Sequence, residues 1–180
     1  MLTSLWLPIL LSGAALFFAS FISWMVVQLH KKDWGKLPNE DTVMKSLREQ
    51  NAPLGSYMFP YCDTPEQMKS EAHQKKYQEG PRGVLTLMNP VNMGQNLGLT
   101  LLYFMAVSGT LGYLASFALP AGAPFLNVFR FVGTAGLLAF LSAILQHAIW
   151  FRNRIAGHVV ESVAYALITG LIFAACWPAA

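Results

Sequence analysis

Most residues that could do chemistry lie in one short polar stretch between two long apolar runs. Two histidines, two arginines and a glutamate fall within residues 146–161, and one more histidine ends the first apolar run of the chain. Ionisable groups beside or inside membrane segments are costly, so each one needs a partner or a function. We call these residues the candidate polar cluster: His30, His147, Arg152, Arg154, His158 and Glu161.

The spacing of the cluster predicts that several of its side chains lie at one level. The turn after Trp150 is too short for anything but an antiparallel helical hairpin. His147, one turn before the hairpin, and Glu161, one turn after it, therefore lie at similar depth. His158 and Glu161 are three residues apart and share a helix face. His30 ends its own apolar run at the same level.

Three interpretations of the cluster are open. In the first, an arginine or His158 neutralises Glu161, and the arginines also bind anionic lipid. In the second, haem or a metal ion lies between His30, His147 and His158, because histidine is a common ligand of both, although no CxxCH or HExxH pattern is present. In the third, His147 and Glu161 move protons for a quinone or a lipid substrate. We expect the first, with no catalytic residue, no metal and no cofactor.

The two cysteines add no second site. Cys62 lies in the polar part of the chain and Cys176 at the far end of the last apolar run. A disulfide needs Cα atoms within ~7 Å, and we expect a bilayer to separate these two, so both should be free thiols. No basic cluster adjoins Cys62 in the sequence, which argues against a reactive thiol.

The elements that must position these residues are apolar helices. The composition is 54% hydrophobic and only 12% charged, whereas charged residues make up roughly a quarter of a soluble domain. Seventeen of the 21 charged residues lie between Lys31 and Arg82. The remainder forms four nearly uncharged runs, about 5–29, 94–119, 128–150 and 158–177, each close to the ~20 residues that cross a bilayer. We predict a membrane all-α fold, a four-helix transmembrane bundle.

The basic residues predict its orientation. Four spans place residues 30–93 and the turn 151–157 on one side, which holds eleven lysines and arginines, whereas the other side holds only Arg130. Such an excess marks the cytoplasmic side. We therefore expect periplasmic N- and C-termini, with the first helix as an uncleaved anchor because it lacks a basic n-region and a cleavage site. The net charge of +3 reflects this asymmetry and not a nucleic-acid-binding surface.

The predicted domains are a first transmembrane helix over 1–29, a cytoplasmic α/β insert over 30–93, and transmembrane helices 2–4 over 94–180. In the insert, we expect a helix capped by Asn39, a strand over 56–61, a helix that starts at Thr64-Pro65 and runs to Gly80, and a strand over 83–88.

Small residues at four-residue spacing predict close helix packing. One stripe lies on the second span and one on the fourth: Ser108, Gly112, Ser116, Ala166, Gly170 and Ala174. In lipid, close packing and polar contacts hold helices together, so these stripes indicate a tight bundle. Polarity near mid-bilayer is limited to serine and threonine, which argues against a substrate transporter.

The order of several short pieces resembles a family of uncharacterised bacterial inner-membrane proteins with four transmembrane helices. These pieces are Pro8-Ile9-Leu10-Leu11, His30-Lys31-Lys32-Asp33-Trp34, Leu37-Pro38-Asn39-Glu40, Gly55-Ser56-Tyr57-Met58-Phe59-Pro60, Glu79-Gly80-Pro81, Phe129-Arg130-Phe131-Val132-Gly133-Thr134, Ile149-Trp150-Phe151 and Trp177-Pro178. The resemblance covers nearly the whole chain and implies this topology and a bacterial origin, and it adds no catalytic residue.

We therefore expect a non-enzymatic accessory or scaffolding protein of the bacterial inner membrane. Its partners would be membrane lipids together with other membrane proteins or a second copy of itself, with no nucleic acid. The alternative is a membrane redox enzyme, using haem or quinone, or a lipid-active enzyme, with its site at the histidine and glutamate cluster.

Overall fold

A computed structural model describes residues 2–180, which form two compact units. One unit contains residues up to Gly35 together with Asn92–Ala180, and the other is the insert Lys36–Val91. The expected insert began at residue 30, but His30 and the residues up to Gly35 pack with the helical unit instead. Each unit is described here by itself.

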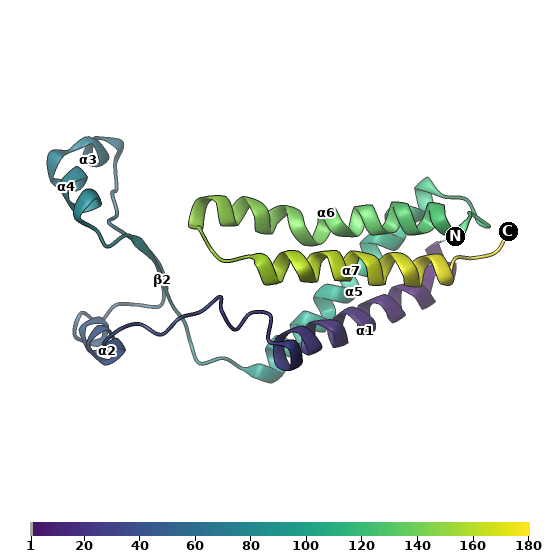
Figure 1. Cartoon of the computed structure of the whole chain (residues 1–180), viewed down its shortest axis with the longest axis horizontal. Helices are drawn as coiled ribbons and strands as arrows, with labels where there is room; N and C mark the ends of the chain where they lie inside the picture. The colour runs from purple at the N-terminus through teal and green to yellow at the C-terminus, as the bar shows by residue number, and fades with distance from the viewer. Residues whose placement is uncertain (1) are drawn as a thin grey trace. The chain divides into compact units, whose positions relative to one another are not determined.

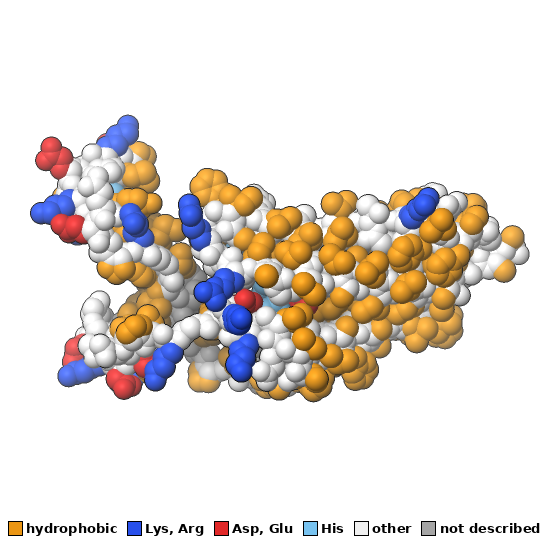
Figure 2. Space-filling model, in the orientation of Figure 1, with side chains coloured by type: hydrophobic (Ala, Val, Ile, Leu, Met, Phe, Trp, Pro, Cys, Tyr) orange, Lys and Arg blue, Asp and Glu red, His pale blue; other side chains and the backbone are white. Residues whose placement is uncertain are grey.

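The helical unit contains four apolar helices, as the hydropathy pattern predicts. The first consists of a 3-10 turn, η1 (Leu2–Leu5), an α-helix, α1 (Trp6–Phe21), and a terminal π-helix, η2 (Ile22–Val27). The others are α5 (Met93–Ala118), α6 (Phe125–Phe151) and α7 (Ala156–Ala175). All four are long and apolar enough to cross a membrane. Hydrophobic side chains cover the visible face of this unit (Figure 2).

The first helix packs against α5 and α7, and α6 packs mainly against α7. α6 and α7 form an antiparallel hairpin and run side by side (Figure 1). α1 runs antiparallel to α5, because Ile9 approaches Gly112 whereas Gly13 approaches Met105. The end of α1 and the start of α5 therefore lie at the same end of the bundle.

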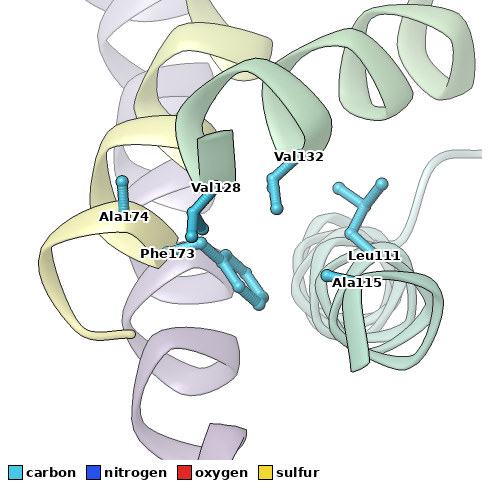
Figure 3. Close-up of a cluster of buried hydrophobic side chains, with 6 residues drawn as sticks. All are labelled: Leu111, Ala115, Val128, Val132, Phe173 and Ala174. Carbon is cyan, nitrogen blue, oxygen red and sulfur yellow. The ribbon is translucent and has the colours of Figure 1, made fainter. Parts of the chain in front are cut away.

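Two groups of buried side chains hold the bundle together. Where α5, α6 and α7 meet, Phe173 inserts among aliphatic side chains (Figure 3), and the group consists of Leu111, Ala115, Val128, Val132, Phe173 and Ala174. The second group contains Leu16 and three aromatic rings. In it, Tyr165 makes edge-to-face contacts with Phe104 and Phe140, at centroid distances of 5.4 and 5.5 Å.

Most of the predicted small residues lie at helix contacts. Ser108, Gly112, Ala166 and Ala174 are buried. Gly170 is buried as well, and a Cβ there would lie 3.1 Å from the backbone oxygen of Phe129. Ser116 is the exception, because it is half-buried and donates its hydroxyl to the backbone oxygen of Tyr113.

The insert contains the helices and strands that the sequence indicates, with two differences. Its elements are α2 (Glu40–Glu49), β1 (Gly55–Phe59), α3 (Pro65–Lys69), α4 (Glu71–Glu79) and β2 (Gly83–Leu87), and β1 pairs antiparallel with β2. The single helix expected from Thr64 to Gly80 is wrong, because Ser70 adopts an extended conformation and caps a second helix. Asn39 precedes α2 in a left-handed conformation and makes no side-chain cap, whereas Thr64 caps α3 as predicted.

The insert has no buried core. None of residues 36–91 is buried, and large apolar side chains such as Met58, Tyr61, Val84 and Met88 are at least half exposed. The exposed side chains Met58 and Val84 lie directly opposite each other in the β1–β2 pair. Units of this size bury only part of their apolar surface even when they fold alone.

We predict that Gly170→Leu destabilises the bundle, whereas Gly109→Leu does not. A side chain at Gly170 meets the α6 backbone within 3.1 Å, and a Cβ at Gly109 has nothing within 4 Å. Overpacking costs about 1–3 kcal/mol. Thermal unfolding of both variants in detergent measures the difference, and equal midpoints would argue against close packing of α6 and α7.

Candidate functional site

The end of the first helix turns His30 back onto the bundle. Gln28 adopts a left-handed conformation that ends η2, and the backbone nitrogen of Lys31 then donates to the oxygen of Gln28. As a result, the imidazole of His30 stacks on the indole of Trp24, with centroids 4.1 Å apart and planes 19° apart. Only 3% of His30 is exposed.

The start of α7 provides the opposite wall. Gly157 faces His30 so closely that a Cβ there would lie 2.9 Å from the ring carbon Cε1. Glu161, one turn further along α7, is buried with 7% of its surface exposed. His158 lies between Gly157 and Glu161 in the sequence of α7, and its ring centroid is 4.3 Å from that of His30. A glycine at position 157 is therefore what lets the imidazole of His30 reach the carboxylate.

Two carboxylates and two imidazoles converge in this region. His30 Nδ1 lies 2.7 Å from Asp33 Oδ2, and His30 Nε2 lies 3.1 Å from Glu161 Oε2. His158 Nδ1 lies 3.9 Å from the same oxygen of Glu161. We call Trp24, His30, Asp33, Gly157, His158 and Glu161 the His30 site. One ligand atom from each of His30, His158 and Glu161 lies within 4.8 Å of the others.

The contact between His30 and Glu161 is close but is not a well-formed hydrogen bond. Although 3.1 Å separates Nε2 from Oε2, the atoms are not aligned, and in the described chain His30 Nε2 and Glu161 Oε1 have no hydrogen-bond partner. Asp33 accepts a hydrogen bond from the Nδ1–H group of His30. In neutral His30, the lone pair on Nε2 therefore faces the carboxylate of Glu161. Two acceptors that face each other repel, unless a proton or a cation lies between them.

Of the three side chains expected to neutralise Glu161, His158 approaches its carboxylate, at 3.9 Å, whereas Arg152 and Arg154 do not. Arg154 donates to the backbone oxygen of Lys32 at 2.7 Å, which fixes the segment after the first helix to the α6–α7 turn. Arg152 ends α6 in a left-handed conformation and is exposed. Among the residues that the structure describes, the only basic side chains within 4.0 Å of the Glu161 carboxylate are His30 and His158.

His147 lies outside the His30 site. Its ring is exposed, stacks on Phe151 with centroids 4.4 Å apart, and its Nδ1 lies 3.3 Å from the amide nitrogen of Asn153. The site therefore does not contain the histidine that the proton-transfer interpretation pairs with Glu161. Haem between His30 and His158 would need the two rings on opposite faces of a porphyrin, but the rings are in direct contact.

Three residues of the site were not among the sequence candidates. Asp33 follows His30 by three residues, a spacing that one turn can close, so it could have been paired with His30 from the sequence. Trp24 lies near the end of an apolar run, where tryptophan is typical of a membrane interface, so the sequence does not mark it as a site residue. Gly157 gave no separate signal, because its role depends on the position of another helix. The hydroxyl of Tyr165 also lies near Glu161 and Ser20.

The insert contains a second pair of reactive groups. Cys62 Sγ lies 2.8 Å from His73 Nδ1, in a pocket that Pro60, Tyr61, Gln67, Ser70, Ala72 and Lys76 also line. Both cysteines are free thiols, as predicted. Although no basic cluster adjoins Cys62 in the sequence, α4 brings the side chain of His73 to it from eleven residues away. An adjacent imidazole can take the thiol proton and leave the nucleophilic thiolate.

Comparison of the chain with models of known protein families, with curated proteins and with solved structures gives no match. The chemistry of both sites is therefore argued from their geometry.

We predict that Cys62 reacts with iodoacetamide faster in the wild-type protein than in the His73→Gln variant. Glutamine keeps a polar side chain but cannot accept the thiol proton. Gln78→Ala, an exposed change on the same helix, is the matched control and should leave the rate unchanged. Peptide mass spectrometry of time-quenched samples measures the rate at each cysteine, and equal rates in all three proteins would show that His73 does not activate Cys62.

Proposed function

We propose that the chain is a multi-pass accessory protein of the bacterial inner membrane, which holds the insert 36–91 at the cytoplasmic face for another protein to bind. The observation that carries this proposal is the composition of the insert surface. Large apolar side chains are exposed on it, and none of its residues is buried. Apolar patches that remain in water commonly mark interaction sites.

The bundle supports this proposal by fixing where the insert begins. His30 is held between Trp24 and Glu161, and the next residues are held by the bond from Arg154 to the oxygen of Lys32. The insert starts four residues later, at Lys36.

A second candidate function is a membrane redox or lipid-active enzyme with its site at His30. The observation that favours it is that two buried atoms of the His30 site, His30 Nε2 and Glu161 Oε1, have no hydrogen-bond partner among the residues that the structure describes. Buried polar groups are nearly always hydrogen-bonded, so exceptions point to a function. The two candidate functions require different parts of the chain. A scaffold requires the exposed apolar side chains of the insert, whereas an enzyme requires the His30 site.

The first test is topology. Eleven lysines and arginines flank one side of the four helices and Arg130 alone the other, and such an excess faces the cytoplasm. A reporter fused at Pro65 should be active in the cytoplasm, and one fused at Ala180 in the periplasm. Alkaline phosphatase and fluorescent-protein fusions measure both. The reverse pattern would overturn the proposed orientation and the cytoplasmic insert.

The second test separates the scaffold from the enzyme. The double change Met58→Thr and Val84→Thr removes the apolar pair from the exposed face of the strands but keeps residues compatible with a β-strand. In a strain that lacks the gene, this variant should fail to restore the wild-type phenotype, whereas Glu161→Gln should restore most of it.

The control is Gln74→Thr with Gln78→Thr, two changes at exposed polar positions of the insert, which should complement fully. Membrane-fraction immunoblots confirm that all variants accumulate. If the double threonine variant complements while a stably expressed Glu161→Gln behaves as the deletion, the scaffold is wrong and the enzyme is supported.

A further inference from the structure

We propose that His30, His158 and Glu161 bind one divalent transition-metal ion, of which Zn²⁺ is the representative. The site lies at the end of the helical unit, and all three ligands belong to that unit. The inference does not depend on the accessory function, because metal content is measured on the purified protein and scaffold function in the cell.

The three ligand atoms are already close to the spacing that a metal ion requires. A tetrahedral zinc ion binds nitrogen and oxygen at about 2.0–2.1 Å, which places its ligand atoms roughly 3.3 Å from one another. In the structure, Glu161 Oε2 lies 3.1 Å from His30 Nε2 and 3.9 Å from His158 Nδ1. Small rotations of side chains would therefore complete the site.

The second argument comes from the groups behind His30. Asp33 Oδ2 accepts a hydrogen bond from His30 Nδ1–H, with 2.7 Å between the two atoms. This bond fixes the tautomer of neutral His30 in which Nε2 carries a lone pair. Metal-binding histidines are commonly held in this way by a carboxylate on the other ring nitrogen. Nε2 is then directed at Glu161 without a hydrogen-bond partner, and His30 is 3% exposed. A cation at this point satisfies both the lone pair and the carboxylate.

A proton in place of the metal ion explains less of the geometry. A doubly protonated His30 could bridge Asp33 and Glu161, and its stacking on Trp24 would favour a positive ring. However, the Nε2 proton would not be aligned with Glu161, because no hydrogen bond forms there. His158 would also have no part in such a bridge, although its Nδ1 approaches the same carboxylate oxygen. A metal ion uses both histidines.

The ligand types indicate the class of metal. Two imidazole nitrogens and one carboxylate oxygen suit zinc and its first-row neighbours, whereas calcium and magnesium prefer oxygen ligands alone. Three protein ligands leave a fourth position for water or another small ligand. The side chain of His158 is 36% exposed, so this position can be reached from solvent.

The experiment uses the full chain, purified in detergent without a polyhistidine tag and stripped of metal. Zn²⁺ is titrated in competition with a chromophoric chelator, and bound metal is counted by mass spectrometry. We expect one zinc per chain. Asp33→Asn should weaken binding by about 10- to 100-fold, because Asp33 only positions a ligand, and His30→Ala, His158→Ala and Glu161→Gln should weaken it further.

His147→Ala is the matched control, because His147 is exposed on α6 and lies outside the site. Its zinc affinity should equal that of the wild type. Absence of stoichiometric zinc, or equal losses in His147→Ala and His30→Ala, would overturn the proposal and leave only adventitious surface binding.

Folding is controlled within the same series. Glu161→Gln keeps the shape of the side chain, so its circular dichroism should match that of the metal-free wild type. Cobalt(II) provides an independent signal, because an ordered tetrahedral site gives visible absorption bands that the wild type should show and Glu161→Gln should lose. A folded Glu161→Gln variant that keeps both the bands and the zinc affinity would also overturn the proposal.

Discussion

The buried carboxylate of Glu161 is the constraint on which the architecture of this end of the bundle depends. Removing an ion from water costs several kcal/mol, so a buried charge needs a partner. The basic side chains nearest to Glu161 are histidines and not the nearby arginines, since His30 and His158 approach the carboxylate and Arg154 binds a backbone oxygen instead. Because His30 follows the first helix and Glu161 belongs to α7, the approach of these two side chains also brings together the first and last helices of the bundle.

Glycine makes both the site and the bundle possible for the same physical reason. Gly157 admits the ring of His30, Gly112 admits Ile9 and Phe173, and Gly170 admits the α6 backbone. At each position, a Cβ would come within 3.1 Å of a neighbouring atom. Close approach increases dispersion contacts, which matter in lipid because the hydrophobic effect between helices is absent there.

The sequence predicted the helices better than the site. Four apolar runs were sufficient for the bundle, because length and hydropathy are local properties. One neighbour of Glu161, His158, is local and was expected, but the contact with His30 is not local. It depended on a left-handed Gln28 that turns His30 back onto Trp24, and no pattern in the sequence marks that turn. The arginines were misassigned because proximity in sequence was taken for pairing, although long cationic side chains at a helix end readily extend towards water.

The insert shows the same limit on a smaller scale. Its strands and most helix boundaries follow from proline, glycine and capping residues, which act on their neighbours. The contact between Cys62 and His73 joins a loop to α4, whose N-cap is Ser70, and no pattern in the sequence marks a new helix there. Contacts between elements, and not the elements themselves, were what could not be predicted.

The bundle and the insert are stabilised in different ways. The bundle has buried clusters, whereas the insert has a paired strand hairpin and no buried residue. Closing a long loop costs entropy, and the cost is smaller when the two ends are already held together. α1 and α5 pack antiparallel, so the bundle brings the two ends of the insert to the same end of neighbouring helices. The bundle thereby favours a compact insert, although none of the insert's own residues is buried.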